Sequence, residues 1–156
     1  MPVGTPKIQN DALNALLATG TGISWDDGGT NFAFALLDEN YSRDAADTDW
    51  GDVSADEVDT GSFPDYAQIA CTGRSVVYTG GAAQLHSDRA DFGEDVTIDA
   101  KWLVCVKGSA GSLAAGAKII FVVDLDNTSG SAVYSISNGD FAVRSHANGW
   151  IDIKQL

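Results

Sequence analysis

The run Phe32–Leu37 (Phe-Ala-Phe-Ala-Leu-Leu) constrains the fold of this chain more than any other stretch. Successive side chains of a strand point to opposite faces, so Phe32, Phe34 and Leu36 share one face and the alanines and Leu37 share the other. Both faces are apolar, which is typical of a strand that is covered on both sides. We therefore predict that Phe32–Leu37 is a central strand of the core.

Further short apolar runs, separated by turn residues, follow along the chain. Lys101–Lys107 and Lys118–Leu125 are the richest in β-branched and aromatic residues, and Asn138-Gly139 and Asn148-Gly149 are typical hairpin turns. We predict the other strands at Tyr66–Cys71, Arg74–Thr79, Ala83–Ser87, Val96–Ile98, Ser131–Ile136, Gly139–Ser145 and Trp150–Lys154, the last three as a meander. This many short strands predicts a mainly β protein, a single antiparallel β-sandwich of the jelly-roll type.

The N-terminal part has a different pattern. Thr5 and Pro6 suit the N-cap and the first position of a helix, and apolar residues recur at helical spacing from Lys7 to Ala18. We predict an N-terminal arm over residues 1–6, a short amphipathic helix over 7–18 and a β body over 32–156. No change of composition marks a second domain, and 156 residues suffice for one buried core.

An acidic connector, Asp38–Asp59, follows the central strand. It contains nine carboxylates and one arginine, a net charge of −8 within a chain whose net charge is −13. A connection of this length inside a compact domain is usually either functional or disordered. Carboxylates suit Ca²⁺, but neither the connector nor Asp124–Asn127 has the spacing of a calcium-binding loop. A solvated acidic loop is the favoured interpretation, with calcium binding as the alternative.

Charge and composition exclude several classes of partner. The chain has 9 Lys and Arg against 22 Asp and Glu, so we expect neither nucleic acid nor a membrane surface as a partner. A basic protein surface would suit it better. We see no signal peptide and no apolar run of membrane-spanning length. Cys71 and Cys105 lie within strand-like sequence, which predicts a reduced, buried pair rather than a disulfide.

The sequence contains no catalytic signature. His86 and His146 stand far apart in polar sequence, and the Gly-x-Ser-x-Gly turn of a serine nucleophile does not occur. A nucleophilic cysteine needs an exposed, electropositive environment, whereas the neighbours of Cys71 and Cys105 are apolar. Gly108–Ser112 resembles a phosphate-binding loop only in its glycines. We therefore expect no enzyme, no cofactor and no metal site.

The aromatic residues leave two interpretations open. Mid-strand Trp102 is expected in the core, and Trp150 in the core or at its rim. Trp25 and Trp50 lie in acidic, glycine-rich loops, where they would either anchor an interface or pack beneath the loop. From the N-terminal arm, the loops around the connector and the small-residue loop Gly108–Gly116, we select as candidate interface residues Pro2, Val3, Trp25, Tyr41, Trp50 and Ser112.

The order of motifs along the chain also resembles a known group of proteins. The motifs are Phe32–Tyr41, Trp50–Val58, the step from Gly61 to Tyr66, Thr72–Val76, Phe92–Ile98, Val122–Leu125 and Gly139–Ile151. Together they are similar to small virion-associated structural proteins of tailed bacteriophages, encoded among head and tail genes. The likeness covers most of the chain from about residue 7. Neither the Gly108–Gly116 loop nor the histidines belong to it.

The resemblance implies a capsid decoration, or cement, protein on the outer surface of the virion. Such proteins commonly form homotrimers at threefold and quasi-threefold positions, bind the major capsid protein and stabilise the shell against internal DNA pressure. Assembly in the host cytoplasm is expected, and no catalysis is implied. Two alternatives stay open, namely a tail-associated structural protein (a fibre, spike or neck component) and a carbohydrate-binding module for host attachment.

Overall fold

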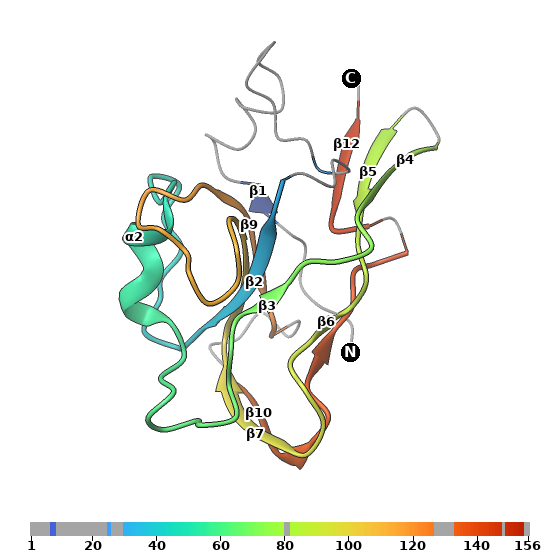
Figure 1. The fold of residues 1–156 in the computed structure, drawn as a ribbon. Helices are drawn as coiled ribbons and strands as arrows, with labels where there is room; N and C mark the ends of the chain where they lie inside the picture. The colour runs from blue at the N-terminus through green and yellow to red at the C-terminus, as the bar shows by residue number, and fades with distance from the viewer. Residues whose placement is uncertain are drawn as a thin grey trace.

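The structure is a computed structural model that describes residues 7–8, 25, 30–79, 82–126, 133–147 and 149–154. Within these ranges the chain is mainly β, as predicted, with one short helix, α2 (Trp50–Val53), and a 3₁₀ turn, η1 (Ser54–Asp56) (Figure 1). The strands are β1 (Lys7–Ile8), β2 (Phe32–Leu37), β3 (Ile69–Ala70), β4 (Ser75–Thr79), β5 (Ala82–His86), β6 (Ala90–Asp91), β7 (Val96–Ala100), β8 (Trp102–Lys107), β9 (Ile119–Asp124), β10 (Tyr134–Gly139), β11 (Ala142–Val143) and β12 (Ile151–Lys154).

The largest sheet has five strands in the order β1-β9-β8-β2-β3, and each neighbouring pair is antiparallel. Strand β2 pairs with β8 along its whole length, from Phe32 opposite Lys107 to Leu37 opposite Trp102. All six of its residues are buried. The prediction of a central strand at Phe32–Leu37 is therefore confirmed, and β8 and β9 begin within one residue of their predicted positions.

The two faces of this sheet pack against different partners, as the alternation of side chains requires. Phe32, Phe34 and Leu36 belong to the main core, which also contains Leu103, Cys105, Phe121 and Val123 of the neighbouring strands. Ala35 and Leu37 belong to a second cluster together with Val104, Val106, Ile119 and Val122. The second cluster also includes side chains from the acidic connector, which covers this face of the sheet.

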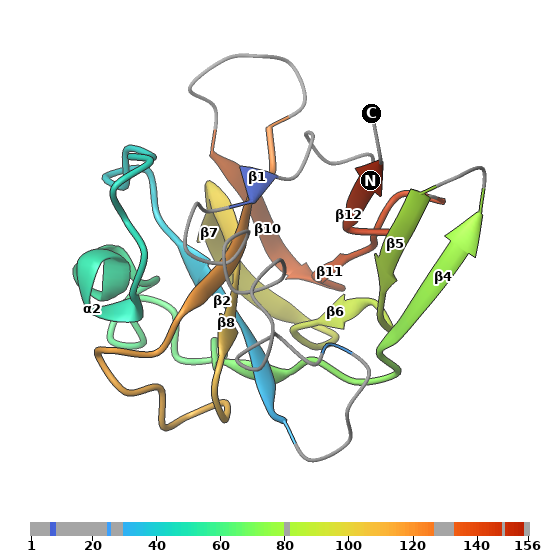
Figure 2. The same ribbon diagram turned by 90° about the horizontal axis from the view of Figure 1, so that it is seen from above.

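The remaining strands form an antiparallel ribbon rather than the predicted C-terminal meander. Residues 82–100 run alongside residues 134–154, with β5 on β12, β6 on β11 and β7 on β10 (Figures 1 and 2). Strand β4 adds to the outer side of β5. The Trp150 ring joins this ribbon to the main sheet, because its centroid lies 5.3 Å from that of Phe34 and 5.5 Å from that of Phe121.

The two predicted Asn-Gly hairpin turns have different outcomes. Asn138 has a positive φ of 49°, but the chain continues from β10 to pair with β6 instead of folding back on β10. Gly149 does lie in a tight turn, since its N–H donates to the His146 carbonyl at 2.8 Å. Its φ is +81°, and a Cβ at this position would lie 2.4 Å from the Leu85 carbonyl oxygen, so only glycine fits.

The N-terminal prediction fails where the structure describes it. Lys7 and Ile8, expected to begin a helix, form strand β1 opposite Val122 and Phe121. Pairing with the edge of β9 satisfies the backbone groups of both strands, which outweighs the weak helical preference of this segment. Residues 9–18 and the arm 1–6 lie outside the described residues. In the described part of the chain the sheets remain open at their edges. Among the helices that the structure describes, none could cross a membrane.

Candidate functional site

The acidic connector Asp38–Asp59 is held against the sheet, and against the loop that precedes β9, by backbone hydrogen bonds near its end and in its middle. Near its end, the Val58 N–H donates to the Leu36 carbonyl at 3.0 Å. In the middle, the Trp50 N–H donates to the Ala117 carbonyl at 2.7 Å. The connector is therefore a covering layer of the sheet with a defined conformation, and carboxylates on it such as Glu39 and Asp44 are exposed to solvent.

A short helix begins inside the connector with a capping box, in which Asp49 is the N-cap and Asp52 is the third helical residue. One carboxylate oxygen of Asp52 accepts hydrogen bonds from the N–H groups of Thr48 and Asp49, both at 3.0 Å. These bonds satisfy donors that a helix start leaves without intrahelical partners. They also hold the pKa of Asp52 below its usual value, with the Asp49 N–H as the larger cause. Helix α2 then turns Trp50 and Val53 towards the sheet.

Tyr41 and Trp50, predicted as interface anchors, are buried beneath the connector. Each is only 5% exposed, and both belong to the second hydrophobic cluster. Tyr41 packs edge-on against Trp102 at 5.6 Å, and its hydroxyl donates to Asp47 at 3.0 Å. The apolar face left by β2, β8 and β9 needs a cover, and these rings supply it. Neither ring is exposed, so these side chains pack beneath the connector and do not form the exposed anchors that were expected.

Trp25 is likewise buried, at 1% exposure. Its ring centroid lies 5.0 Å from that of Phe32, and its indole N–H donates to the His86 carbonyl at 2.7 Å. The apolar ring and the polar N–H are thus both satisfied inside the protein, which rules out this residue as an exposed anchor. Trp150 is also in the core, and Trp102, which was predicted in the core, is half-buried and packs against the second cluster.

Several carboxylates of the connector bind nearby backbone donors. Asp59 accepts hydrogen bonds from the Gly61 N–H at 2.9 Å and from the N–H and hydroxyl of Ser62, and these bonds lower its pKa. Asp47 accepts from the Asp44 N–H at 3.1 Å in addition to Tyr41. Negative charge is thereby fixed in position at the surface. Exposed acids on this layer include Glu39, Asp44, Asp52 and Asp59.

The described residues contain no group of three or more His, Cys, Asp or Glu side chains arranged to hold a metal ion. The second acidic cluster considered for calcium, which includes Asp124 and Asp126, forms ion pairs with a lysine instead. Lys101, which is buried, places its Nζ 2.9 Å from Asp124 and 3.8 Å from Asp126. These carboxylates neutralise a buried cation that belongs to the fold.

The Gly108–Gly116 loop lies next to the connector and supports it. The Ala115 carbonyl accepts a hydrogen bond from the Gly51 N–H at 2.7 Å, and Leu113 packs against the second cluster. Ser112, a predicted contact residue, is exposed, and its N–H donates to the Ser109 carbonyl at 3.2 Å. Of the six predicted contact residues, Ser112 alone is described and exposed, while Pro2 and Val3 lie outside the described residues.

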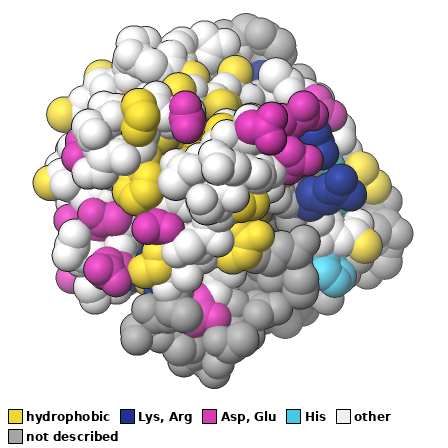
Figure 3. Space-filling view, turned by 90° about the horizontal axis from the view of Figure 1, so that it is seen from below, with side chains coloured by type: hydrophobic (Ala, Val, Ile, Leu, Met, Phe, Trp, Pro, Cys, Tyr) yellow, Lys and Arg dark blue, Asp and Glu magenta, His cyan; other side chains and the backbone are white. Residues whose placement is uncertain are grey.

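The surface combines charge and apolar groups without a large field of one sign on the face shown in Figure 3. Acidic side chains there are spread among neutral and hydrophobic ones, and the visible Lys and Arg side chains adjoin a group of acids. The described ion pairs at the surface include Arg89 with Asp91, and Lys118 with Asp49 at 2.6 Å. The excess negative charge of the connector is thus only partly neutralised within the chain.

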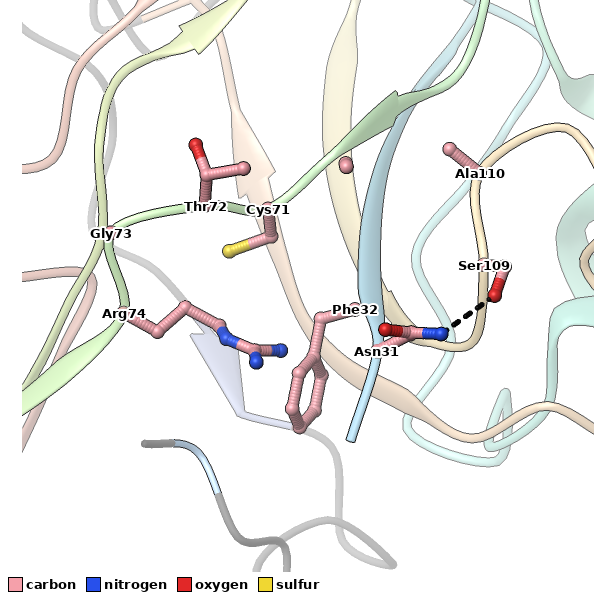
Figure 4. A pocket seen from close by; sticks show the side chains of 9 residues that line it. Asn31, Phe32, Cys71, Thr72, Gly73, Arg74, Ser109 and Ala110 are labelled. Atoms are coloured by element: carbon pink, nitrogen blue, oxygen red, sulfur yellow. Dashed lines mark hydrogen bonds between the residues drawn. The ribbon is translucent and has the colours of Figure 1, made fainter. Parts of the chain in front are cut away.

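A cavity of about 660 Å³ opens at the beginning of β2, and no sequence motif indicated it. Its walls come from the start of β2, the segment after β3 and the Gly108–Gly116 loop, and include Phe32, Cys71, Thr72, Arg74 and Ser109 (Figure 4). The Arg74 guanidinium lies 4.7 Å from the centroid of the Phe32 ring. Cys71 is buried among apolar neighbours in the main core, as expected, but it also shares this cavity with a cation and two hydroxyl groups.

No family model, curated protein or solved structure matches this chain.

Proposed function

We propose that this chain is a virion structural protein of a tailed bacteriophage, a decoration protein that binds the outer capsid surface. The resemblance of its motifs to that group supports the assignment. The observation that carries it is the ordered acidic connector, because a surface whose charge is fixed in place suits docking on another protein better than turning over a substrate. The proposed partner is the major capsid protein, and the proposed assembly is a homotrimer that stabilises the shell.

The burial of the connector aromatics changes the kind of contact that is proposed. The outer surface of the connector carries carboxylates such as Glu39 and Asp44, so the matching partner surface is basic and polar. Electrostatic complementarity gives speed and specificity of binding more than affinity. Repetition of the same contact around a symmetric shell raises the overall affinity without a new contact. A stable contact still requires about 800 Å² from each partner.

The arrangement of the sheets as a two-layer sandwich of the jelly-roll type is part of the same proposal. It is supported by the main core, which joins Phe34 and Phe121 of the five-stranded sheet to Leu85 and Phe141 on and beside the ribbon. Facing sheets with interlocking apolar side chains are the architecture of a β-sandwich. An experimental structure of the purified chain with any other layering would overturn this part.

The carbohydrate-binding alternative loses its main support. Stacking on a sugar needs a flat, exposed aromatic face, and Trp25, Trp50 and Trp150 are all buried. A glycan array with the purified chain still provides a direct test, and specific binding would revive that alternative.

The assignment is tested by the location and copy number of the chain in purified virions. Hundreds of copies per virion, with density on the outer capsid surface in an electron-microscopy map, are expected. A few dozen copies or fewer, or density on the tail or neck, would contradict the decoration role and favour a tail component.

The contact surface is tested separately with charge reversal on capsids that lack the protein. Glu39→Lys changes an exposed acid on the connector, and Glu94→Lys makes the same change at an exposed position outside it. We expect Glu39→Lys to reduce occupancy several-fold at about 0.15 M salt, with a smaller difference at about 1 M, where charges are screened within a few ångströms. Equal occupancy of the two variants would refute the connector as the contact surface.

A further inference from the structure

Cys71 and Cys105 lie on opposite sides of the central strand β2 and face the same core. The Cys71 N–H donates to the Phe32 carbonyl at 2.8 Å, just after β3 ends, and Cys105 of β8 lies opposite Phe34. Both residues are buried and belong to the main core. Strand β2 separates the backbones of the two cysteines, although both side chains lie in the same core.

The two thiols differ in their access to the outside. Cys105 is 0% exposed, whereas Cys71 is 5% exposed and forms part of the wall of the 660 Å³ cavity. Figure 4 shows the Cys71 sulfur above the Arg74 side chain, which extends towards the Phe32 ring. A small molecule that enters this cavity therefore meets one sulfur atom beside one guanidinium group.

The same surroundings stabilise the thiolate form of Cys71. The Cys105 thiol is the main cause, because its hydrogen bond to Cys71 lowers the pKa of the Cys71 thiol. Ser87 and Arg74 contribute in the same direction, whereas burial and the negative charge of Asp88 raise this pKa. Burial is the main cause of the opposite shift at Cys105, whose pKa is raised well above its usual value. Reactivity follows the thiolate and its exposure, and both favour Cys71.

A disulfide between the two residues does not fit the sheet. Two strands that flank a third are separated by about 9–10 Å at the standard spacing of neighbouring strands. Disulfide formation needs Cα atoms about 4.4–6.8 Å apart. The two thiols lie within hydrogen-bonding reach of each other, but the backbones that carry them flank β2. A disulfide would therefore require these backbones to move together across β2, which makes Cys105 poorly placed to resolve a modified Cys71.

We propose that Cys71 is a selective modification site, whose thiolate reacts in the cavity with a small anionic disulfide to form a stable mixed disulfide. The Cys71 proton passes to water, and the thiolate sulfur attacks one sulfur of the reagent. A new bond forms between the two sulfur atoms, the S–S bond of the reagent breaks, and its other half leaves as a thiolate. No net oxidant is consumed, because one disulfide replaces another. The guanidinium of Arg74 attracts the negative charge of the reagent and of the leaving group.

The test uses the full chain and 5,5′-dithiobis(2-nitrobenzoate), a coloured anionic disulfide. We expect one equivalent of thionitrobenzoate from the native protein, at a rate proportional to reagent concentration, and two equivalents in guanidinium chloride. Cys71→Ala and, as a second variant, Cys71→Ser should lose the native equivalent, while Cys105→Ala retains it at a lower rate. Release only after unfolding, release of two equivalents from the native chain, or release that survives both Cys71 substitutions would overturn the proposal.

The role of Arg74 is separated from simple access by a second reagent. Arg74→Gln should slow the anionic disulfide several-fold, and it should have a smaller effect on methyl methanethiosulfonate, which is small and uncharged. An equal effect on both reagents would refute an electrostatic role. The reaction rates of Cys71 do not depend on where the protein lies in a virion. The failure of this proposal would therefore leave the capsid assignment untouched, and the reverse also holds.

Discussion

Replacing Trp50 with alanine removes the largest side chain that the connector buries. Trp50 is 5% exposed, and its neighbours in the second cluster include Val104, Val106 and Ile119. Truncation of a buried tryptophan costs about 3–5 kcal/mol, from lost burial and from the cavity that remains. A protein of this size has a free energy of unfolding of about 5–15 kcal/mol, so this single change removes a large part of it.

The assay is equilibrium unfolding in guanidinium chloride, together with a thermal scan. For a chain of about 150 residues, each kcal/mol shifts Tm by about 2–4 °C, so we expect Trp50→Ala to lower Tm by about 6–20 °C. The matched control is Val77→Ala, at a large hydrophobic side chain that is 42% exposed, where the change should stay within about 0.5 kcal/mol. If Trp50→Ala unfolds at the same denaturant concentration as this control, the connector does not cover the sheet in the way described.

Three further changes test other parts of the structure. Tyr66→Phe removes a hydroxyl that accepts a hydrogen bond from the Leu36 N–H at 3.1 Å and donates one to Glu57 at 2.7 Å. Chemical denaturation should show that the free energy of unfolding falls by about 1–3 kcal/mol. Tyr134→Phe is the control, and an equal loss in both variants would contradict the role of this hydroxyl. Lys101→Met leaves the carboxylates of Asp124 and Asp126 without their buried cation and should cost about 3–5 kcal/mol, a prediction that an unchanged unfolding midpoint refutes. The lowered pKa of Asp52 means that its contribution to stability is present above the unfolded-state pKa of about 4 and is lost as the pH falls below it. Asp52→Asn should therefore reduce the slope of Tm against pH on the acid side. Asp65→Asn, at an exposed position, should leave that slope unchanged. Identical profiles for the two variants would exclude a capping role for the Asp52 carboxylate.

The sequence predicted the parts of the fold that depend on local patterns. Strands β2, β8 and β9 are long apolar runs, and their burial on both faces follows from the alternation of side chains. The pairing of the ribbon was not predictable in this way, because Ala82 meets Lys154 and Ala90 meets Val143 across more than fifty residues of sequence. An Asn-Gly pair favours a tight turn but does not determine which strand the following residues join.

In the candidate site, too, features that depend on local sequence could be predicted, and features that depend on distant segments could not. Negative charge in the connector was evident from composition, but the four-residue helix inside it depends on Asp52 and on carbonyls from another loop. The burial of Tyr41 and Trp50 required knowing that an apolar sheet face lay beneath them. The Cys71 cavity was missed because its walls come from three separate segments, around Phe32, Thr72 and Ser109.

The position of these aromatic rings also determines what an interface on the connector can be. Protein interfaces that bind tightly through a few residues usually bury exposed tryptophan, tyrosine or arginine in a pocket of the partner. Here Tyr41 and Trp50 are already used to hold the connector on its sheet, and the outer surface retains carboxylates. A single contact of this kind is polar, wet and sensitive to salt. Stable attachment through such a surface requires many identical contacts at once, which is the condition that a symmetric capsid provides.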